Sequence, residues 1–140
     1  MQRALLLSCL LGLSACPQDR RMALRENVEA FNDSVRWSRP MFAASYVQPK
    51  GRDAFLRRHS AAATVRVTDY NVGRVAYRSP DVAVVLISLD WYRVDQGAAH
   101  RTVVMQTWSH EEGRWLLAEQ RWVSGPSCPL FSAGPAMKTK

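Results

Sequence analysis

Residue types that can do chemistry are few in this sequence. The chain has three cysteines and three histidines. No set of His, Cys, Asp or Glu has the spacing of a metal site, no glycine-rich loop is placed to hold a phosphate, and no GxSxG motif offers a nucleophilic serine. The sequence therefore predicts neither a metal nor a cofactor.

Cys16 is the one reactive residue with an informative neighbourhood. A positively charged start is followed by a mostly apolar run from Ala4 to Leu13 and then by two small residues. This is the three-part order of a secretory signal. The run is too short to span a bilayer, which takes roughly 20 residues as a helix. Residues 1–15 are therefore predicted to be a signal peptide.

The string Leu13-Ser14-Ala15-Cys16 resembles the lipobox of bacterial lipoproteins. In that family the cysteine sulfur carries diacylglycerol, the signal is cut before it, and the new amino group receives a further acyl chain such as palmitate. The resemblance implies that Cys16 is the lipidation site. Because each buried CH₂ contributes about 0.8 kcal/mol, three chains would anchor the protein essentially permanently. A plain secretory signal is the alternative, and a competing string ending at Cys9 follows too short an apolar region.

The same resemblance bears on location. Pro17 follows the cysteine, where the family uses Asp for retention at the inner membrane, so the periplasmic face of the outer membrane is expected in the cell envelope. The chain has a formal net charge of +7, mostly from scattered arginines. Diffuse positive charge favours association with an anionic membrane, and an exported chain is not expected to bind nucleic acid.

Hydrophobic periodicity predicts the elements that position the remaining polar residues. An apolar stripe recurs at steps of four, three and four and predicts a helix from Arg20 to Trp37. The stripe is Leu24, Val28, Phe31 and Val35. On the opposite side Arg25, Glu26, Glu29 and Asn32 are expected to face water. Pro40 is expected to open a second short helix, and residues 52–59 a third.

After Ser60 the pattern alternates and predicts strands joined by short turns. They run over residues 65–77, 82–94, 102–108 and 115–123, with a bulge at Gly73. An α+β fold is expected, with N-terminal helices packed on a bent four-stranded antiparallel sheet. The predicted division is a lipidated tether at 16–19, one domain at 20–123, and a flexible C-terminal tail at 124–140 in which Pro129-Leu130-Phe131 is a candidate apolar contact.

Helices followed by a bent antiparallel sheet resemble the NTF2-like superfamily, which includes SnoaL-type and steroid-isomerase-type proteins. Gly113-Arg114-Trp115 opens the last strand, and the preceding strand ends in Trp108. The resemblance implies a sheet curled into a cone whose open end holds a ligand, an active site or a partner. The chain departs from the fuller family pattern, because only four long strands are obvious and the early hairpin between the helices is missing or reduced to coil. The depth of the pocket is therefore left open.

Enzymes of that family place ionisable side chains inside the cone, where burial moves carboxylate pKa values toward neutrality. The resemblance gives five candidate pocket residues: Asp90, Tyr92, Gln106, Trp108 and Glu119. Plainer readings stand beside this one. The two acids can pair with arginines on the sheet face, Gln106 can satisfy buried backbone, and the strand tryptophans can be packing residues. The three histidines are expected to be solvated or capping residues.

Three functions follow from these observations. The first is a lipid-anchored, non-catalytic binding or assembly module with a second copy or an envelope protein as partner. The second is a small enzyme or small-molecule binder of isomerase or dehydratase type, using Asp90, Tyr92 and Glu119. The third is a structural component of the envelope. A water-accessible cavity with at least two convergent ionisable groups would favour chemistry, whereas a cone filled by side chains would favour binding through the outside.

Overall fold

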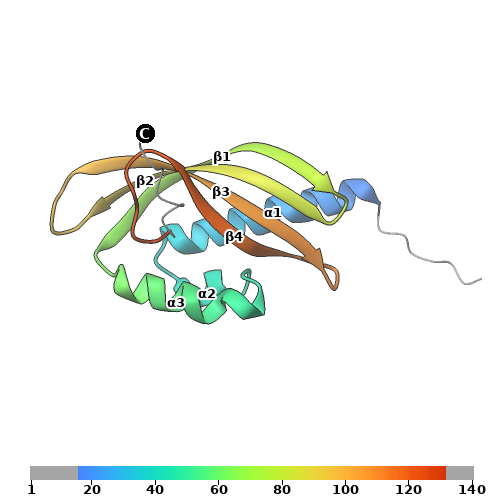
Figure 1. Cartoon of the computed structure of the whole chain (residues 1–140), viewed down its shortest axis with the longest axis horizontal. Coiled ribbons are helices and arrows are strands. Elements are labelled where there is room, and N and C mark those ends of the chain that lie inside the picture. Colours follow the sequence, from blue (N-terminus) through green and yellow to red (C-terminus); the bar gives the residue numbers. More distant parts are fainter. Residues whose placement is uncertain (1–15, 132–140) are drawn as a thin grey trace, which may run out of the picture.

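The computed structural model describes residues 16–131. Four helical segments come first and four strands follow: α1 (Pro17–Arg36), α2 (Pro40–Ala44), the 3-10 turn η1 (Pro49–Gly51), α3 (Arg52–Ala61), β1 (Val65–Ser79), β2 (Val82–Arg93), β3 (Ala99–Glu111) and β4 (Arg114–Ser124). The strands form one antiparallel sheet in the order β1-β2-β3-β4. The sheet is curved and the helices lie against one side of it (Figure 1). The predicted α+β class is confirmed.

The first helix begins directly after Cys16. Pro17 occupies its first turn and Asp19 adds a negative charge there. Both suit a helix start, because proline has a preset φ and an acid complements the positive end of the helix dipole. The predicted stripe of Leu24, Val28, Phe31 and Val35 is buried. Residues 17–19, which were expected to form a tether, are helical, so α1 reaches the residue next to Cys16.

A short extended segment stands where the early hairpin was expected to be missing or reduced to coil. It lies between α2 and η1 and forms a parallel bridge between Val47 and Leu117 of β4. The backbone N–H of Leu117 donates to Tyr46 at 2.7 Å, and that of Gln48 donates to Leu117 at 2.9 Å. This bridge joins the helical layer to the edge of the sheet.

Alternation along the strands divides the sheet into two faces. The inner face packs under the helices and includes Val85, Ile87 and Leu89 of β2, all with no measurable exposure. The bulge expected at Gly73 is present, because the β1–β2 register shifts between Val72 and Val75. A Cβ at Gly73 would lie 3.1 Å from the Leu86 carbonyl oxygen, so glycine permits the close approach of the two strands there.

The segment that follows β4 folds back onto the core. Cys128, Leu130 and Phe131 are buried, and the indole N–H of Trp122 donates to the Gly125 carbonyl at 2.9 Å. Gly125 has a φ of 84°, a conformation that glycine adopts without steric cost. The tail expected to be flexible from residue 124 is therefore packed as far as Phe131, and its remainder lies outside the described residues.

Candidate functional site

Strand alternation separates the five candidate pocket residues. Gln106 and Trp108 of β3 are on the inner face and have no measurable exposure. Asp90 and Tyr92 alternate with the buried Leu89 and Trp91 on β2, so they lie on the outer face. Glu119 is exposed on the edge strand β4. Because successive side chains of a strand point to opposite faces, the acids do not meet Gln106 and Trp108 in one cavity.

Asp90 forms a bidentate ion pair on the outer face. The Nε of Arg101 lies 2.7 Å from its Oδ1, and an η-nitrogen of Arg101 lies 2.8 Å from its Oδ2. These hydrogen bonds from Arg101 lower the pKa of the Asp90 carboxyl. The pairing on the sheet face expected as the plainer reading is present. A carboxylate held ionised is poorly suited to donate a proton near neutral pH.

Glu119 is also paired with an arginine, since its Oε1 lies 2.8 Å from the Nε of Arg121. Both side chains are about half exposed, so the pair contributes little to stability. Glu119 also lines a groove of about 200 Å³ between α3 and β4, together with Phe55, Arg58 and Gln120. This groove is the place where one of the predicted acids meets an apolar surface.

The interior of the cone contains a buried hydrogen-bond network of Asn32, Gln106 and Trp108. Gln106 Nε2 donates to Asn32 Oδ1 at 3.0 Å, and Trp108 Nε1 donates to Gln106 Oε1 at 3.2 Å. Asn32 Nδ2 in turn donates to the Val28 carbonyl at 2.8 Å. Every side-chain nitrogen and oxygen of the two amides, and the indole nitrogen, thus has a partner. Such satisfied networks fix one arrangement of a core.

Asn32 was expected to face water, and this prediction is wrong, because its exposure is 1%. The spacing contained the signal, since Asn32 follows Val28 by four residues and precedes Val35 by three. It therefore shares the apolar stripe of α1. The polar chemistry of Asn32 alone favours a solvent-exposed position. Its partner Gln106 on β3 supplies the hydrogen bond that allows the side chain to be buried.

Aromatic rings fill the rest of the interior. The ring of Phe31 meets Trp108 edge-on, with centroids 5.9 Å apart, and lies 5.8 Å from Phe55. Trp91, Trp108 and Trp115 have exposures of 3%, 0% and 1%, which confirms the packing role expected for them. The indole N–H of Trp91 donates to Thr102 at 2.9 Å. Helix α1 and β3 therefore meet through side chains in this part of the cone.

The histidines lie against aromatic rings and are only partly exposed. His59 stacks on Phe55 with centroids 4.0 Å apart, and its Nδ1 lies 3.0 Å from the Phe55 carbonyl, to which the ring donates as the Nδ1–H tautomer. Burial lowers the pKa of His59. His100 packs on Trp91, and His110 packs on Trp115. Among residues 16–131, no group of acids, histidines and cysteines is arranged to hold a metal ion.

Cys16 is exposed at the start of α1. The preceding residues 1–15, predicted to be the signal, lie outside the described part of the chain. Within that part, no helix has the length and apolar character needed to cross a membrane. Cys128, in the segment that follows β4, is 2% exposed, and burial raises its pKa to about 11.

Solved structures share this architecture. A ketosteroid isomerase-like protein from Erwinia carotovora atroseptica aligns with a TM-score of 0.60 at 14% identity, over 74% of this chain and 95% of that one. An NTF2-like protein of unknown function from Pseudomonas putida aligns with a TM-score of 0.63 at 11% identity, over 87% and 98%. A putative scytalone dehydratase from Novosphingobium aromaticivorans aligns with a TM-score of 0.59 at 14% identity, over 86% of this chain and 95% of that one.

These likenesses show that the chain has the NTF2-like fold. No protein-family model matches the sequence, and no curated protein matches it. The shared feature is the helical layer on a curved antiparallel sheet, as the sequence predicted.

Proposed function

We propose that this protein is a non-catalytic binding module of NTF2-like fold, held at a membrane by lipid on Cys16. The observation that carries the non-catalytic part is the Asn32–Gln106–Trp108 network. Its hydrogen bonds occupy the amide groups of Asn32 and Gln106 and the indole nitrogen of Trp108. A substrate binding there would have to break them, and an unpaired buried polar group costs about 1–3 kcal/mol.

The distribution of acids supports the same proposal. Asp90 is paired with Arg101 on the outer face, and Glu119 is paired with Arg121 on the edge strand. The three buried residues of the network, Asn32, Gln106 and Trp108, carry no ionisable side chain. Proton transfer to a bound ligand would need such a group within hydrogen-bond reach.

The lipid anchor is supported by the lipobox-like string and by the start of α1. Because the helix begins at Pro17, an anchor on Cys16 would hold the first turns of α1 at the membrane surface. Arg20, Arg21 and Arg25 lie in those turns, and each basic residue near an anionic surface contributes about 1 kcal/mol to association. We place the protein at the periplasmic face of the outer membrane.

Partition between detergent and water tests the anchor. The Cys16→Ser chain is expected to move from the detergent phase to the aqueous phase and to retain its leader, which a mass measurement detects. The matched control is Cys9→Ser, which removes the competing cysteine and is expected to leave partition unchanged. An unchanged detergent fraction for Cys16→Ser would overturn the anchor.

Complementation of a deletion strain tests the absence of catalysis. An Asp90→Asn/Glu119→Gln double variant is expected to restore every phenotype that the natural chain restores, because both changes keep size and remove only the acids. Loss of rescue at normal protein levels would support the second candidate function, a small-molecule enzyme. The groove between α3 and β4 favours that candidate, because Glu119 and Arg58 line it together.

The partner in this proposal is a second copy of the chain or another envelope protein. The outer sheet face provides partly exposed apolar residues, among them Leu86, Val103 and Met105. Light scattering after size exclusion would distinguish a homodimer from a monomer, and cross-linking of the lipidated protein in membranes would identify a different partner by mass spectrometry.

A further inference from the structure

An apolar groove lies between α1 and the second half of β1, outside the interior network. Its volume is about 280 Å³. Apart from Arg21 and Arg25, the lining consists of apolar residues, a glycine and Tyr77. On the helix, Arg21, Leu24, Arg25 and Val28 recur at steps of three, one and three, which places them on one face. This region is termed the α1–β1 groove.

The strand side of the groove is uncovered. Val75 is 43% exposed and Tyr77 is 39% exposed, although both are large apolar or aromatic residues. The register shift between Val72 and Val75 marks the point beyond which β1 is mostly exposed. Beyond Gly73, apolar surface therefore stays in contact with water, which is unfavourable unless a ligand covers it.

A second hollow of about 350 Å³ continues the groove toward Cys16. Arg21 and Tyr77 line both hollows, and Pro17, Pro80 and Trp115 are among the other residues of the second. The turn between β1 and β2 lies beside the start of α1 (Figure 1), where Arg20 pairs with Asp81 at 3.0 Å. The two hollows have the size of the smaller ligand sites of proteins, about 300 Å³.

The charges at the groove are unequal. Arg20 is paired with Asp81, and Arg25 is paired with Glu29 at 2.9 Å. Arg21 has no carboxylate partner within the described range, and its guanidinium lies over the Tyr77 ring, 5.3 Å from the centroid. It is thus the cation at this groove whose charge an anion would neutralise. An apolar hollow with one uncompensated guanidinium complements a molecule that has an apolar chain and one negative group.

We propose that the α1–β1 groove binds the acyl chain of a fatty acid, with its carboxylate held by Arg21. Burial of the acyl chain supplies the affinity, and the arginine–carboxylate hydrogen bonds fix the orientation of the ligand. The site lies at the end of α1 that begins next to Cys16, where the proposed function puts the membrane. Binding itself does not require lipidation, so the groove and the anchor can fail independently.

The test uses the full chain carrying Cys16→Ser. It measures how well oleate displaces a fluorescent fatty acid from this chain. Oleyl alcohol, which has the same chain without the charge, is the second ligand. Oleate is expected to bind more tightly than the alcohol. Arg21→Gln is expected to weaken oleate about tenfold or more and to leave the alcohol unchanged, because it removes one charge-assisted contact. Val75→Asp is expected to weaken both ligands.

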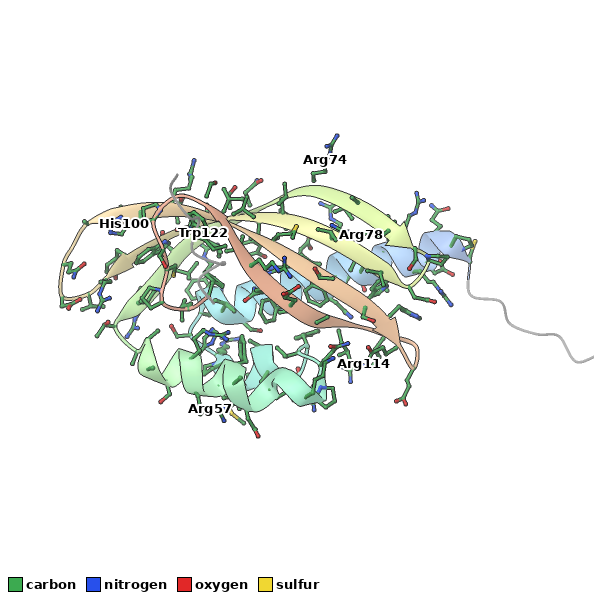
Figure 2. All side chains as sticks on the ribbon, in the orientation of Figure 1. Arg57, Arg74, Arg78, His100, Arg114 and Trp122 are labelled. Carbon is green, nitrogen blue, oxygen red and sulfur yellow. The ribbon has the colours of Figure 1, made fainter. Side chains whose placement is uncertain are left out.

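Arg74→Gln is the matched control. It also removes one guanidinium charge, at the position of β1 next to Val75. Arg74 projects from the sheet away from the helical layer (Figure 2). Its affinity for oleate is expected to equal that of the Cys16→Ser chain. All variants are expected to fold, because Arg21, Arg74 and Val75 are exposed and not core residues. Thermal melts check that each variant is folded.

Three outcomes overturn the proposal. The first is absence of oleate binding by folded protein. The second is an equal loss in Arg74→Gln and Arg21→Gln, which would assign binding to diffuse charge. The third is oleate binding that Val75→Asp leaves unchanged, which would place the ligand outside the α1–β1 groove.

Discussion

Two regions of this molecule use the same helix and the same sheet in opposite ways. In the interior network, the polar groups of α1 and β3 bond to one another, and aromatic rings fill the remaining space. In the α1–β1 groove, Val75 and Tyr77 stay exposed and Arg21 has no acid to pair with among residues 16–131. The proposed binding site thus lies at the edge of this fold, whereas its centre is closed by packed and hydrogen-bonded side chains.

The cause of the difference is the path of β1. Its first residues, Val65 and Val67, are buried under the helices. After the bulge at Gly73 the strand continues where few side chains cover it. Bulges bend a strand and increase its twist, so a local change in β1 separates a covered half from an open half.

The largest expected effect is on the interior. Trp108→Ala removes a fully buried ring that contacts Phe31 and Gln106, and the cavity left behind is expected to lower the free energy of unfolding by about 3–5 kcal/mol. Urea denaturation measures this. Val75→Asp in the groove is expected to change the same quantity by no more than about 0.5 kcal/mol. Similar losses from the two changes would remove the distinction between the regions.

A double-mutant cycle sharpens the comparison within the network. Gln106→Leu leaves Asn32 Oδ1 and Trp108 Nε1 without their bonds, and the expected loss is about 1–3 kcal/mol for each buried group. Adding Asn32→Leu removes one of these unpaired groups. The double variant is therefore expected to lose less stability than the sum of the two single variants, and strict additivity would contradict a coupled network.

A smaller effect is expected from pH through His59. Burial lowers its folded-state pKa below the ordinary value of 6.5, so the unfolded chain binds more protons between the two pKa values. Stability is therefore expected to be complete above about pH 6.5 and to fall as the pH drops toward the folded pKa. Comparison of urea midpoints at several pH values with those of His59→Phe checks this. An unchanged slope in the variant would assign the dependence to another group.

Periodicity predicted the elements because burial of one face determines both the helix stripe and the strand alternation. Leu24, Val28 and Ile87 are core residues for that reason. Asn32 was misplaced although its spacing puts it on the apolar stripe, because the partner that permits its burial, Gln106, lies 74 positions away, and no local pattern shows that pairing. The early start of α1 was missed because Pro17 was read as part of a tether, although proline favours the first turn of a helix.

The candidate pocket was less predictable than the fold. Asp90, Tyr92 and Glu119 were grouped with Gln106 and Trp108 by resemblance, whereas strand parity places Asp90 and Tyr92 on the opposite face from Gln106. The groove was not predicted at all. The bulge at Gly73 was predicted, but the groove depends on which side chains cover β1 beyond it, and no residue pattern within β1 shows that.

Methyl chemical shifts on addition of oleate show where the ligand binds. Leu24, Val72 and Val75 report on the α1–β1 groove, and Ile87, Leu89 and Val104 report on the buried interior. The first set is expected to shift in proportion to bound oleate while the second set stays in place. Shifts confined to Ile87, Leu89 and Val104 would contradict binding in the groove, because they would mean that the interior opens to admit the ligand.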